Sequence, residues 1–277
     1  MALETLKRHV GRVVPADIKR LCHGLGVERS VPYENGYHCC TQKTASQTLR
    51  AVFSDPIFHR YSGLWPHVFS QDPEHVQDAM IDHPFPRRTM GTNLYIDHPT
   101  FLEMPKPVRY KALFVLRDPR DIVTSWYFSA RYSHRPTGLI PQFRSDLERL
   151  DLSEGLKYSI DTLQSRGLFQ AQLSWVHATD DQIKLVRYED LAADQRGFLR
   201  GVLDFLEVEM PADQFVALCD RHRFEVHSGG RKAGIADLQS HYRNGTAGDW
   251  MNHFDQSVIA HFKEVTGSLL EELGYSQ

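Results

Sequence analysis

The chain has 277 residues, enough to bury a large core, and its 41% hydrophobic and 24% charged residues are typical of an ordinary globular protein. A formal net charge of −3 argues against a nucleic-acid binder, which would usually be basic overall, but it is compatible with a local basic pocket. No apolar run is long enough to span a membrane, and the four cysteines form neither a CxxC pair nor a zinc spacing, so we expect a cytoplasmic protein.

The N-terminal part of the chain leads into a candidate anion site. Residues 1–30 mix apolar and basic residues and predict a peripheral helical segment. Residues 37–40 predict a short strand, and a loop of small polar residues around Lys43 then leads into a helix over about 46–54. A helix N-terminus beside a lysine offers free amides and a positive charge, which suits an anion. The loop lacks the GxxxxGK[ST] spacing of a Walker A motif.

Residues 55–86 are rich in prolines and aromatics and predict an irregular loop, which either shapes an acceptor pocket or is plain surface. The histidines of this segment lie among prolines that no single helix could align, so we expect no metal site. Residues 92–96 predict a strand. His98 follows that strand, where it is either a catalytic base or a hydrogen-bonded structural residue.

The stretch 111–133 predicts a second anion site. Residues 112–116 read as a buried parallel strand, Asp118 as a helix N-cap and Pro119 as the first helical residue. Arg117 ends the strand and Ser125 lies about two turns into the helix, so their side chains can hold a phosphate together. The alternative is a surface ion pair and a solvated serine.

The C-terminal half predicts further alternation of helices and strands. We expect one long helix over 153–177 that is weakly interrupted by Gly167, a strand over 183–187, helices over 194–206 and 212–221, a lid-like loop over 224–248 and a last helix over 257–273. The whole chain, 1–277, is interpreted as a single α/β domain. Its central, mostly parallel sheet is flanked by helices in three layers, as in P-loop NTPases.

Three separated stretches resemble the sulfotransferases that use PAPS (3′-phosphoadenosine 5′-phosphosulfate). Residues 42–48 are similar to the family's PKSGTTW, and residues 117–125 to RNPKDxxVS, including the eight-residue step from arginine to serine. Residues 243–254 are similar to RKGxxGDWKNHF, which is the longest and most specific match. The order of the motifs also fits, and the resemblance covers roughly residues 35–260.

The resemblance implies a set of residues for the nucleotide. The Lys43 loop would hold the 5′-phosphosulfate, and the 3′-phosphate and adenine would lie against residues from the later motifs. The implied binding residues are Lys43, Thr44, Ala45, Ser46, Gln47, Thr48, Arg117, Ser125, Tyr188, Phe224, Arg243, Asn244 and Gly245.

The resemblance also implies the reaction. A sulfuryl group would pass in line from PAPS to a hydroxyl or amine of a small-molecule acceptor, leaving PAP (adenosine 3′,5′-bisphosphate), without a metal. The aromatic residues in 58–69 and Trp126, Tyr127, Phe128 and Tyr132 suggest an apolar or aromatic acceptor, and core packing is the alternative explanation for several of them. Lys43, His98 and Ser125 would be the catalytic residues, with Lys43 stabilising the leaving phosphate and His98 accepting the acceptor's proton.

The chain also departs from the family pattern. Thr48 stands in place of the tryptophan that stacks on adenine, Ala45 in place of a loop glycine, Ile96 in place of the KTH lysine and Asn244 in place of the RKG lysine. The dimer motif of mammalian members is absent, so the oligomeric state stays open. Two alternatives remain: a P-loop-type kinase or NTPase, and a nucleotide-binding relative that has lost transfer.

Overall fold

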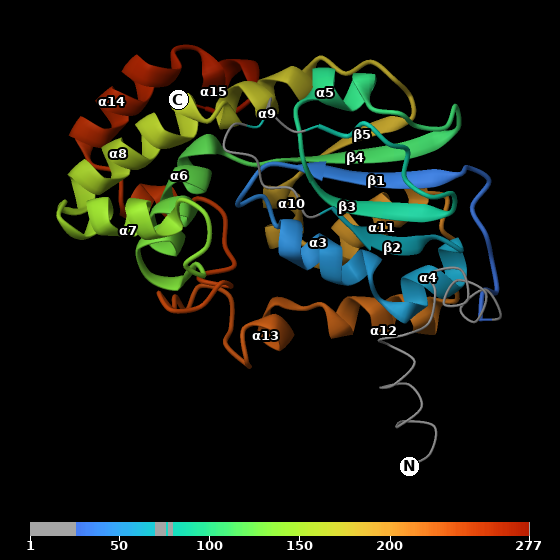
Figure 1. Ribbon diagram of the computed structural model, residues 1–277. Coiled ribbons are helices and arrows are strands. Elements are labelled where there is room, and N and C mark those ends of the chain that lie inside the picture. The colour runs from blue at the N-terminus through green and yellow to red at the C-terminus, as the bar shows by residue number, and fades with distance from the viewer. Residues whose placement is uncertain (1–25, 70–75, 77–79, 277) are drawn as a thin grey trace.

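The computed structural model of the chain describes residues 26–69, 76 and 80–276. Within these ranges five strands form one parallel sheet in the order β2-β3-β1-β4-β5 (Figure 1). The predicted N-terminal helical segment lies almost wholly outside the described residues. The strands are β1 (Asn35–Cys40), β2 (Trp65–Val68), β3 (Thr89–Tyr95), β4 (Tyr110–Leu116) and β5 (Ile183–Arg187).

Helices cover both faces of the sheet, which confirms the predicted three-layer α/β fold (Figure 1). One face carries α5 (His98–Glu103), α6 (Pro119–Phe128), α8 (Leu152–Ser165), α9 (Leu168–Val176), α14 (Gln256–Thr266) and α15 (Leu269–Glu272). The other carries α3 (Ser46–Phe53), α4 (Pro56–Ser62), α10 (Tyr188–Ala193), α11 (Gln195–Phe205) and α12 (Ala212–Arg221). Beyond the sheet's end lie η2 (Ser129–Ser133), α7 (Ile140–Glu148), α13 (Phe224–His227) and η3 (Asp249–Asn252).

The alternation of side chains along β4 explains why both faces are covered. Successive residues of a strand point to opposite faces. Phe114 and Leu116 belong to the core beneath α6, α8 and α9, while Leu113 and Val115 belong to the core beneath α3 and α11. A strand that is apolar at every position therefore has to lie inside a sheet covered on both sides.

Two helices that the sequence presents as continuous are each divided at a glycine. Gly167 separates α8 from α9 with φ of +70°, and Gly267 follows α14 with φ of +60°. Both values lie in the left-handed region that glycine adopts without steric cost, so the helix stops there. The predictions of one helix over 153–177 and one over 257–273 were wrong in this respect.

The segment 55–86 is more regular than expected. Asp55 caps α4 by accepting a hydrogen bond from the Ile57 amide at 2.8 Å, and Pro56 is the first helical residue. β2 then pairs with β3 as the edge of the sheet. The prediction of an irregular loop overlooked this cap and the short edge strand.

The parallel register brings the ends of the inner strands to one edge of the sheet. Cys40 pairs with Tyr95, Cys39 with Phe114, and Leu116 with Arg187. The loops that follow β1, β3, β4 and β5 therefore start side by side, as the strand ends of open α/β sheets do at their ligand sites.

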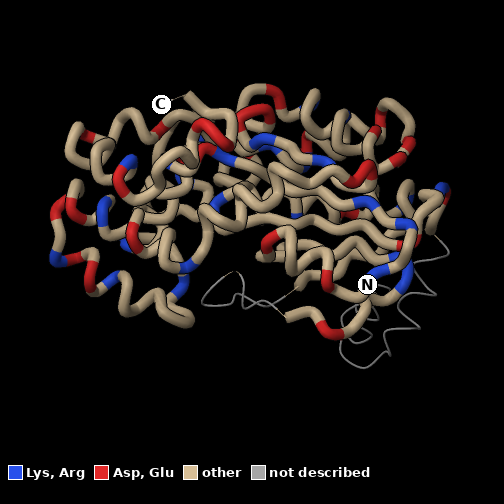
Figure 2. The backbone as a smooth tube through the Cα atoms, turned by 90° about the horizontal axis from the view of Figure 1, so that it is seen from above, with Lys and Arg blue, Asp and Glu red and all other residues tan. Residues whose placement is uncertain are grey.

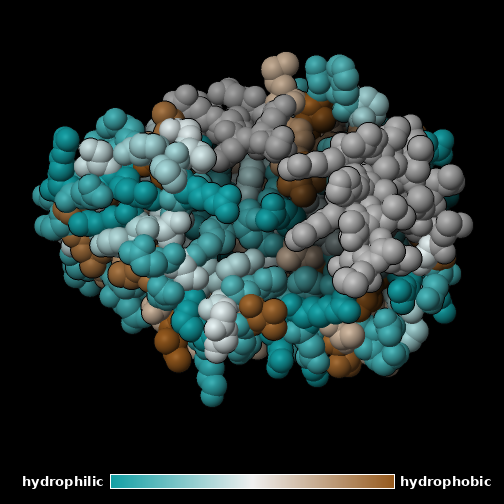
Figure 3. All heavy atoms as spheres, turned by 60° about the horizontal axis from the view of Figure 1, so that its bottom comes forward, coloured by the Kyte–Doolittle hydropathy of each residue, from teal (hydrophilic) through white to brown (hydrophobic). Residues whose placement is uncertain are grey.

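Charged and apolar residues are dispersed over the surface. Figure 2 shows basic and acidic residues interspersed along the backbone, with no face that is solely basic in that view. On the face shown in Figure 3, hydrophobic residues lie singly or in small groups among hydrophilic ones. No helix within the described residues has the length and apolar character needed to cross a membrane.

A buried histidine predicts an acid-sensitive core. His38 lies on β1, fully buried beside Phe53, and neither ring nitrogen has a hydrogen-bond partner among the described residues. Burial lowers the pKa of His38 to about 3. Between that value and the ordinary histidine pKa of about 6.5, His38 is protonated in the unfolded chain and neutral in the folded chain. The free energy of unfolding should therefore fall as pH drops below about 6.5, by at most about 1.4 kcal/mol per pH unit.

Urea unfolding at pH 7 and pH 5 measures this dependence. We expect His38→Leu to lose less stability than the unmodified chain over that interval, because leucine binds no proton in either state. Equal losses in the two proteins would contradict the assignment.

Candidate active site

The loop between β1 and α3 has an unusual backbone. Lys43 and Ala45 have φ values of +68° and +61°, in the left-handed region that non-glycine residues rarely adopt. Thr44 between them is buried, and its hydroxyl donates to the Thr41 carbonyl at 2.8 Å. Left-handed residues in alternation turn successive amides to one side, which forms a nest for an anion.

The helix behind this loop begins without a side-chain cap. Ala45 is the N-cap of α3 and offers no side-chain hydrogen bond to the first amides. Those amides carry the positive end of the helix dipole and still require acceptors. The loop therefore presents amides and the Lys43 ammonium to the same place.

Arg117 reaches this loop from the end of β4. Its guanidinium donates to the Lys43 carbonyl at 2.7 Å and lies 3.9 Å from the centre of the Tyr188 ring. Arg117 is buried, lies 3.8 Å from the Asp121 carboxylate, and its Nε has no partner among the residues that the structure describes. Its guanidinium is thus held in place and still has a donor available.

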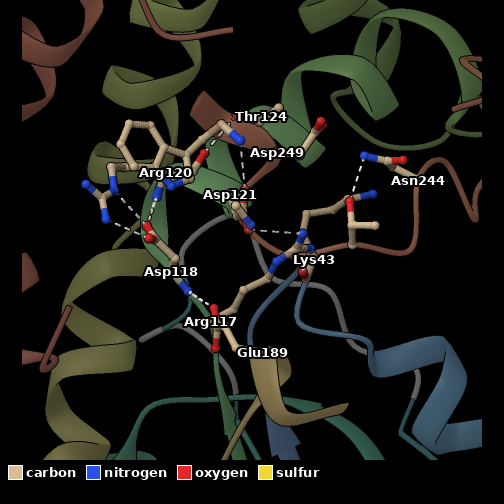
Figure 4. Close-up of polar contacts among 12 residues, drawn as sticks. Lys43, Arg117, Asp118, Arg120, Asp121, Thr124, Glu189, Asn244 and Asp249 are labelled. Atoms are coloured by element: carbon tan, nitrogen blue, oxygen red, sulfur yellow. Dashed lines mark hydrogen bonds and ion pairs between the residues drawn. The ribbon is translucent and has the colours of Figure 1, made fainter. Parts of the chain in front are cut away.

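The first turn of α6 joins the motif around Arg117 to the C-terminal motif (Figure 4). Asp118 caps α6 by accepting from the Arg120 amide at 2.9 Å and also binds the Arg120 guanidinium. Asp121, fully buried, accepts from the amides of Gly248 and Trp250 at 2.7 and 3.0 Å. The Asp121 carboxylate therefore fixes the 243–250 segment beside α6.

Arg243 is the third positive side chain at this place. It pairs with Asp249, and its guanidinium lies 4.6 Å from the centre of the Phe128 ring. Within the described ranges, Arg243 Nε and Asn244 Oδ1 are buried without hydrogen-bond partners. A buried polar atom without a partner is costly, so both atoms point to a ligand that completes their bonding.

Gly245 is required by the packing of the same turn. Its φ is +73°, and a Cβ atom at this position would lie 2.5 Å from carbons of the Phe224 ring. A side chain here would be strained by the backbone and would displace Phe224. The turn after Arg243 therefore lies directly against that ring.

These elements surround one cavity, and its wall combines charged, polar and aromatic side chains. Twelve of the predicted site residues line it, and they come from all the predicted motifs apart from that of His98. They are Lys43, Ala45, Ser46, Gln47, Thr48, Arg117, Ser125, Tyr188, Phe224, Arg243, Asn244 and Gly245.

The structure does not place His98 at the cavity. β3 ends at Tyr95, and Asp97 then caps α5 by accepting from the Thr100 amide at 2.9 Å, so His98 starts that helix. The His98 ring lies 5.0 Å from Trp175, in the layer between α5 and α9. At the end of β3 it is Tyr95 that lines the cavity, with its hydroxyl 3.1 Å from Ser46 Oγ. The structure therefore places His98 outside the residues that line this cavity, and its role as a base stays a prediction.

Other wall residues were missed by the sequence reasoning. Thr44 does not line the cavity by its side chain, whereas six further residues do: Gln42, Tyr95, His134, His241, Tyr242 and Thr246. His241 and Tyr242 directly precede Arg243, so their position beside the specific C-terminal motif was an available signal. Nothing in the local sequence pattern marks His134.

None of the aromatic residues that the sequence offers for an acceptor wall, in 58–69 and at 126–128 and 132, lines this cavity, and several of them pack in the core. Phe58 and Tyr61 pack in the core beneath α3 and α4, and Trp126 and Tyr127 pack in the core around α6 and α8. All four are buried, and none of them lines the cavity. Their aromatic character therefore says nothing about the acceptor.

The positive charges change the proton affinities around the cavity. Burial, with the neighbouring charges of Arg117 and Arg243, lowers the pKa of Lys43 to about 7. Burial and the nearby charge of Lys43 lower the pKa of His241 to about 4. An anion bound here would oppose both effects, because it favours the protonated forms.

The donor set fits a nucleotide with phosphates at two positions. The amide nest, Lys43, and two arginines with available Nε donors are the groups that bind phosphate. In the described part of the chain no group of three or more His, Cys, Asp or Glu side chains is arranged to hold a metal ion. The cavity is therefore a polyanion site built from nitrogen donors.

Comparison with known proteins gives the family of this site. The family model for the sulfotransferase domain matches residues 38–274. Sulfotransferase 6B1 of Danio rerio is 28% identical over 203 residues, which make up 72% of this chain and 64% of that protein. The luciferin sulfotransferase of Photinus pyralis is 21% identical over 218 residues, covering 71% of this chain and 55% of that protein. The chain thus matches less than two thirds of the length of these relatives.

Solved structures share the fold. The mouse sulfotransferase SULT7A1 complexed with PAP matches with a TM-score of 0.57 at 16% identity, covering 92% of this chain and 90% of that one. Retinol dehydratase in complex with androsterone and PAP matches with a TM-score of 0.53 at 19% identity, covering 88% and 82%. At these identities the likeness is one of fold.

The strained alanine in the loop predicts a stabilising substitution. A left-handed alanine costs about 1–2 kcal/mol, which Ala45→Gly removes while adding some freedom to the unfolded chain. We expect the free energy of unfolding to rise by about 0.5–1 kcal/mol.

Thermal unfolding of Ala45→Gly tests this, with Ala51→Gly inside α3 as the matched control. The control should lower stability by about 1 kcal/mol, because its backbone is helical. A loss of stability in both variants would contradict the strain at Ala45.

Proposed function

We propose that this chain, which belongs to the sulfotransferase family, transfers a sulfuryl group from PAPS to a hydroxyl or amine of a small acceptor. The observation that carries the proposal is the meeting of Lys43, Arg117 and Arg243 in one cavity, where two of them retain unpartnered Nε atoms within the described structure. A doubly phosphorylated nucleotide satisfies these donors and offsets the three charges at once.

The two ends of the cavity suit the two phosphate positions of PAPS. Arg117, Ser125, Arg243 and the backbone of the Asn244–Gly245 turn would hold the 3′-phosphate, which distinguishes PAPS from ATP. The amide nest of the Lys43 loop would hold the 5′-phosphosulfate. This division follows the motif order that the family resemblance implies.

The chemistry assigned to this chain is positioning and charge stabilisation. In an in-line transfer the bond between sulfur and the bridging oxygen breaks while a bond from sulfur to the acceptor oxygen forms. The electron pair of the broken bond stays on the phosphate, and Lys43, charged once phosphates raise its pKa, stabilises it. The proton of the acceptor hydroxyl passes to a base on the cavity wall.

We infer that His241 is this base, in place of His98. His241 lines the cavity together with Lys43, and its lowered pKa keeps the ring neutral and able to accept a proton at pH 7. Bound phosphates raise that pKa toward the operating pH, where a general base acts best. His98 does not line the cavity wall.

The kinase or NTPase alternative requires carboxylates free to bind Mg²⁺. The two carboxylates at the start of α6 are already engaged, Asp118 with Arg120 and Asp121 with the amides of Gly248 and Trp250. These engaged carboxylates favour a sulfotransferase over a kinase or NTPase. A measurement of turnover distinguishes a sulfotransferase from a nucleotide-binding relative that has lost transfer.

The acceptor class rests on the relatives. Among them are a luciferin sulfotransferase and a structure that holds androsterone, both of which point to an apolar or aromatic small molecule. The cytoplasmic setting is likewise a proposal. It is supported by Cys39 and Cys219, which are buried and form no disulfide within the described part of the chain.

Substitutions of two cationic residues separate catalysis from binding. Lys43→Ala should lower kcat by about 10²–10³-fold, because it removes charge stabilisation at the leaving phosphate. Arg243→Ala should mainly raise the Kd for PAP, because it removes a 3′-phosphate ligand. Release of PAP from PAPS, measured against a panel of phenols and alcohols, gives kcat, and calorimetry gives the Kd.

Lys111→Ala, at the start of β4 and away from the cavity, is the control and should change neither value. Normal turnover in Lys43→Ala would refute the mechanism. Sulfuryl transfer to no acceptor, with PAP binding intact, would favour the relative that has lost transfer.

The base assignment has its own test. His241→Ala should lower kcat by about 10²–10⁴-fold, whereas His98→Ala should leave kcat within a few-fold of the unmodified chain. The pH dependence of kcat should lose its acidic limb in His241→Ala. If His98→Ala lowers kcat more than His241→Ala does, His98 is the base instead.

A further inference from the structure

A second cavity adjoins the first at the start of α3. It measures about 760 Å³ and is lined by residues of α10, α13 and the 242–245 turn. The two cavities are joined by a common wall, which we define by the six residues that line both: Ala45, Thr48, Tyr188, Phe224, Tyr242 and Gly245.

This common wall contains three aromatic rings, which differ in what already covers them. The Tyr188 ring is occupied by the Arg117 guanidinium at 3.9 Å. Phe224 lies against the Gly245 turn. The Tyr242 hydroxyl lies near the side chain of Thr48. Thr48 is the position where the family resemblance expects a tryptophan that stacks on adenine.

The ring of Tyr242 is held in a fixed orientation from behind. It stacks on the His227 ring at 5.0 Å between ring centres with an interplanar angle of 14°. His227 Nε2 lies 3.3 Å from His222 Nδ1, and His222 Nε2 lies 3.0 Å from the Asp55 carboxylate. Asp55 is itself fixed as the N-cap of α4.

This chain of contacts connects the Tyr242 ring to the rigid layer of α4 and α12. A flat ring with one face already stacked on its neighbour loses little further freedom when a ligand packs against its other face. A residue that merely closes a surface loop would not need these contacts. The contacts lead to the Tyr242 ring, which belongs to the wall common to both cavities.

We propose that Tyr242 is the aromatic wall on which the adenine of the donor stacks, together with Phe224, in place of the tryptophan that Thr48 replaces. The proposal rests on the proposed function and adds a residue to its nucleotide site. Thr48 contributes by its small size, which leaves room for the Tyr242 ring on the common wall. His227, His222 and Asp55 are positioning residues for that ring.

The test compares the Kd for PAP with the Kd for ribose 3,5-bisphosphate, which has the phosphates without the base. Stacking of one base on an aromatic ring is worth about 1–3 kcal/mol, so Tyr242→Ala should weaken PAP binding about tenfold or more. Binding of the base-free bisphosphate should stay unchanged. Tyr242→Phe, which keeps the ring, should bind PAP within a few-fold of the unmodified chain.

A second substitution tests the replacement itself. In the double variant Thr48→Trp/Tyr242→Ala the family's tryptophan takes the space that the tyrosine leaves, and PAP affinity should recover relative to Tyr242→Ala alone. His134→Ala, which alters a cavity residue away from the common wall, is the control and should not change the preference for PAP over the base-free probe.

The positioning residues are tested by a conservative pair. His227→Ala should weaken PAP binding several-fold, and His227→Phe, which restores a stacked ring, should recover it. If Tyr242→Ala binds PAP as tightly as the unmodified chain, or loses the same affinity for PAP and for the base-free bisphosphate, the proposal is wrong while the proposed function stands. Failure of the unmodified chain to bind PAP would overturn the proposed function instead.

Discussion

Three positive side chains held in one cavity are the constraint on which this site depends. Lys43, Arg117 and Arg243 come from segments far apart in the sequence, and burial, together with the charges of the two arginines, lowers the pKa of Lys43 to about 7. The three side chains meet because the parallel strands β1 and β4 end at the same edge of the sheet and Asp121 binds the amides of the third segment beside them. A buried site with this charge is complementary to a polyanion, which favours the protonated form of Lys43.

The same constraint orders the less regular part of the chain. The 224–248 segment contributes Phe224, His241, Tyr242 and Arg243 to the cavity, and it is anchored at one end by Asp121 and at the other by the Asp55–His222–His227 contacts. Both anchors are carboxylates at helix N-termini, one at α4 and one at α6. We interpret the segment as a strap fixed at both ends across the nucleotide site, which supplies the base and the adenine wall together.

Much of the site could be predicted from the sequence because its signals are local. Asp118 followed by Pro119 fixes the start of α6, and the apolar run before Arg117 fixes the strand. His98 was not placed by such signals, since Asp97 caps α5 two residues after the end of β3 and makes His98 the first residue of that helix. Gly167 was recognised only as a weak interruption, because a sequence does not show that its backbone is left-handed. Tyr242 has no periodic signal, and its role depends on contacts with Thr48 and His227 that exist only in the folded chain.

A thermal-shift titration with PAP, compared with ADP and with ATP plus Mg²⁺, measures whether the cavity recognises the 3′-phosphate of the nucleotide. A ligand that binds only the folded chain raises the melting temperature in proportion to the logarithm of its concentration over its Kd. We expect a large shift with PAP, a small shift with ADP, which lacks the 3′-phosphate, and no added shift from Mg²⁺. A shift with Mg-ATP that exceeds the shift with PAP would contradict the proposed sulfotransferase site and would favour a phosphotransferase.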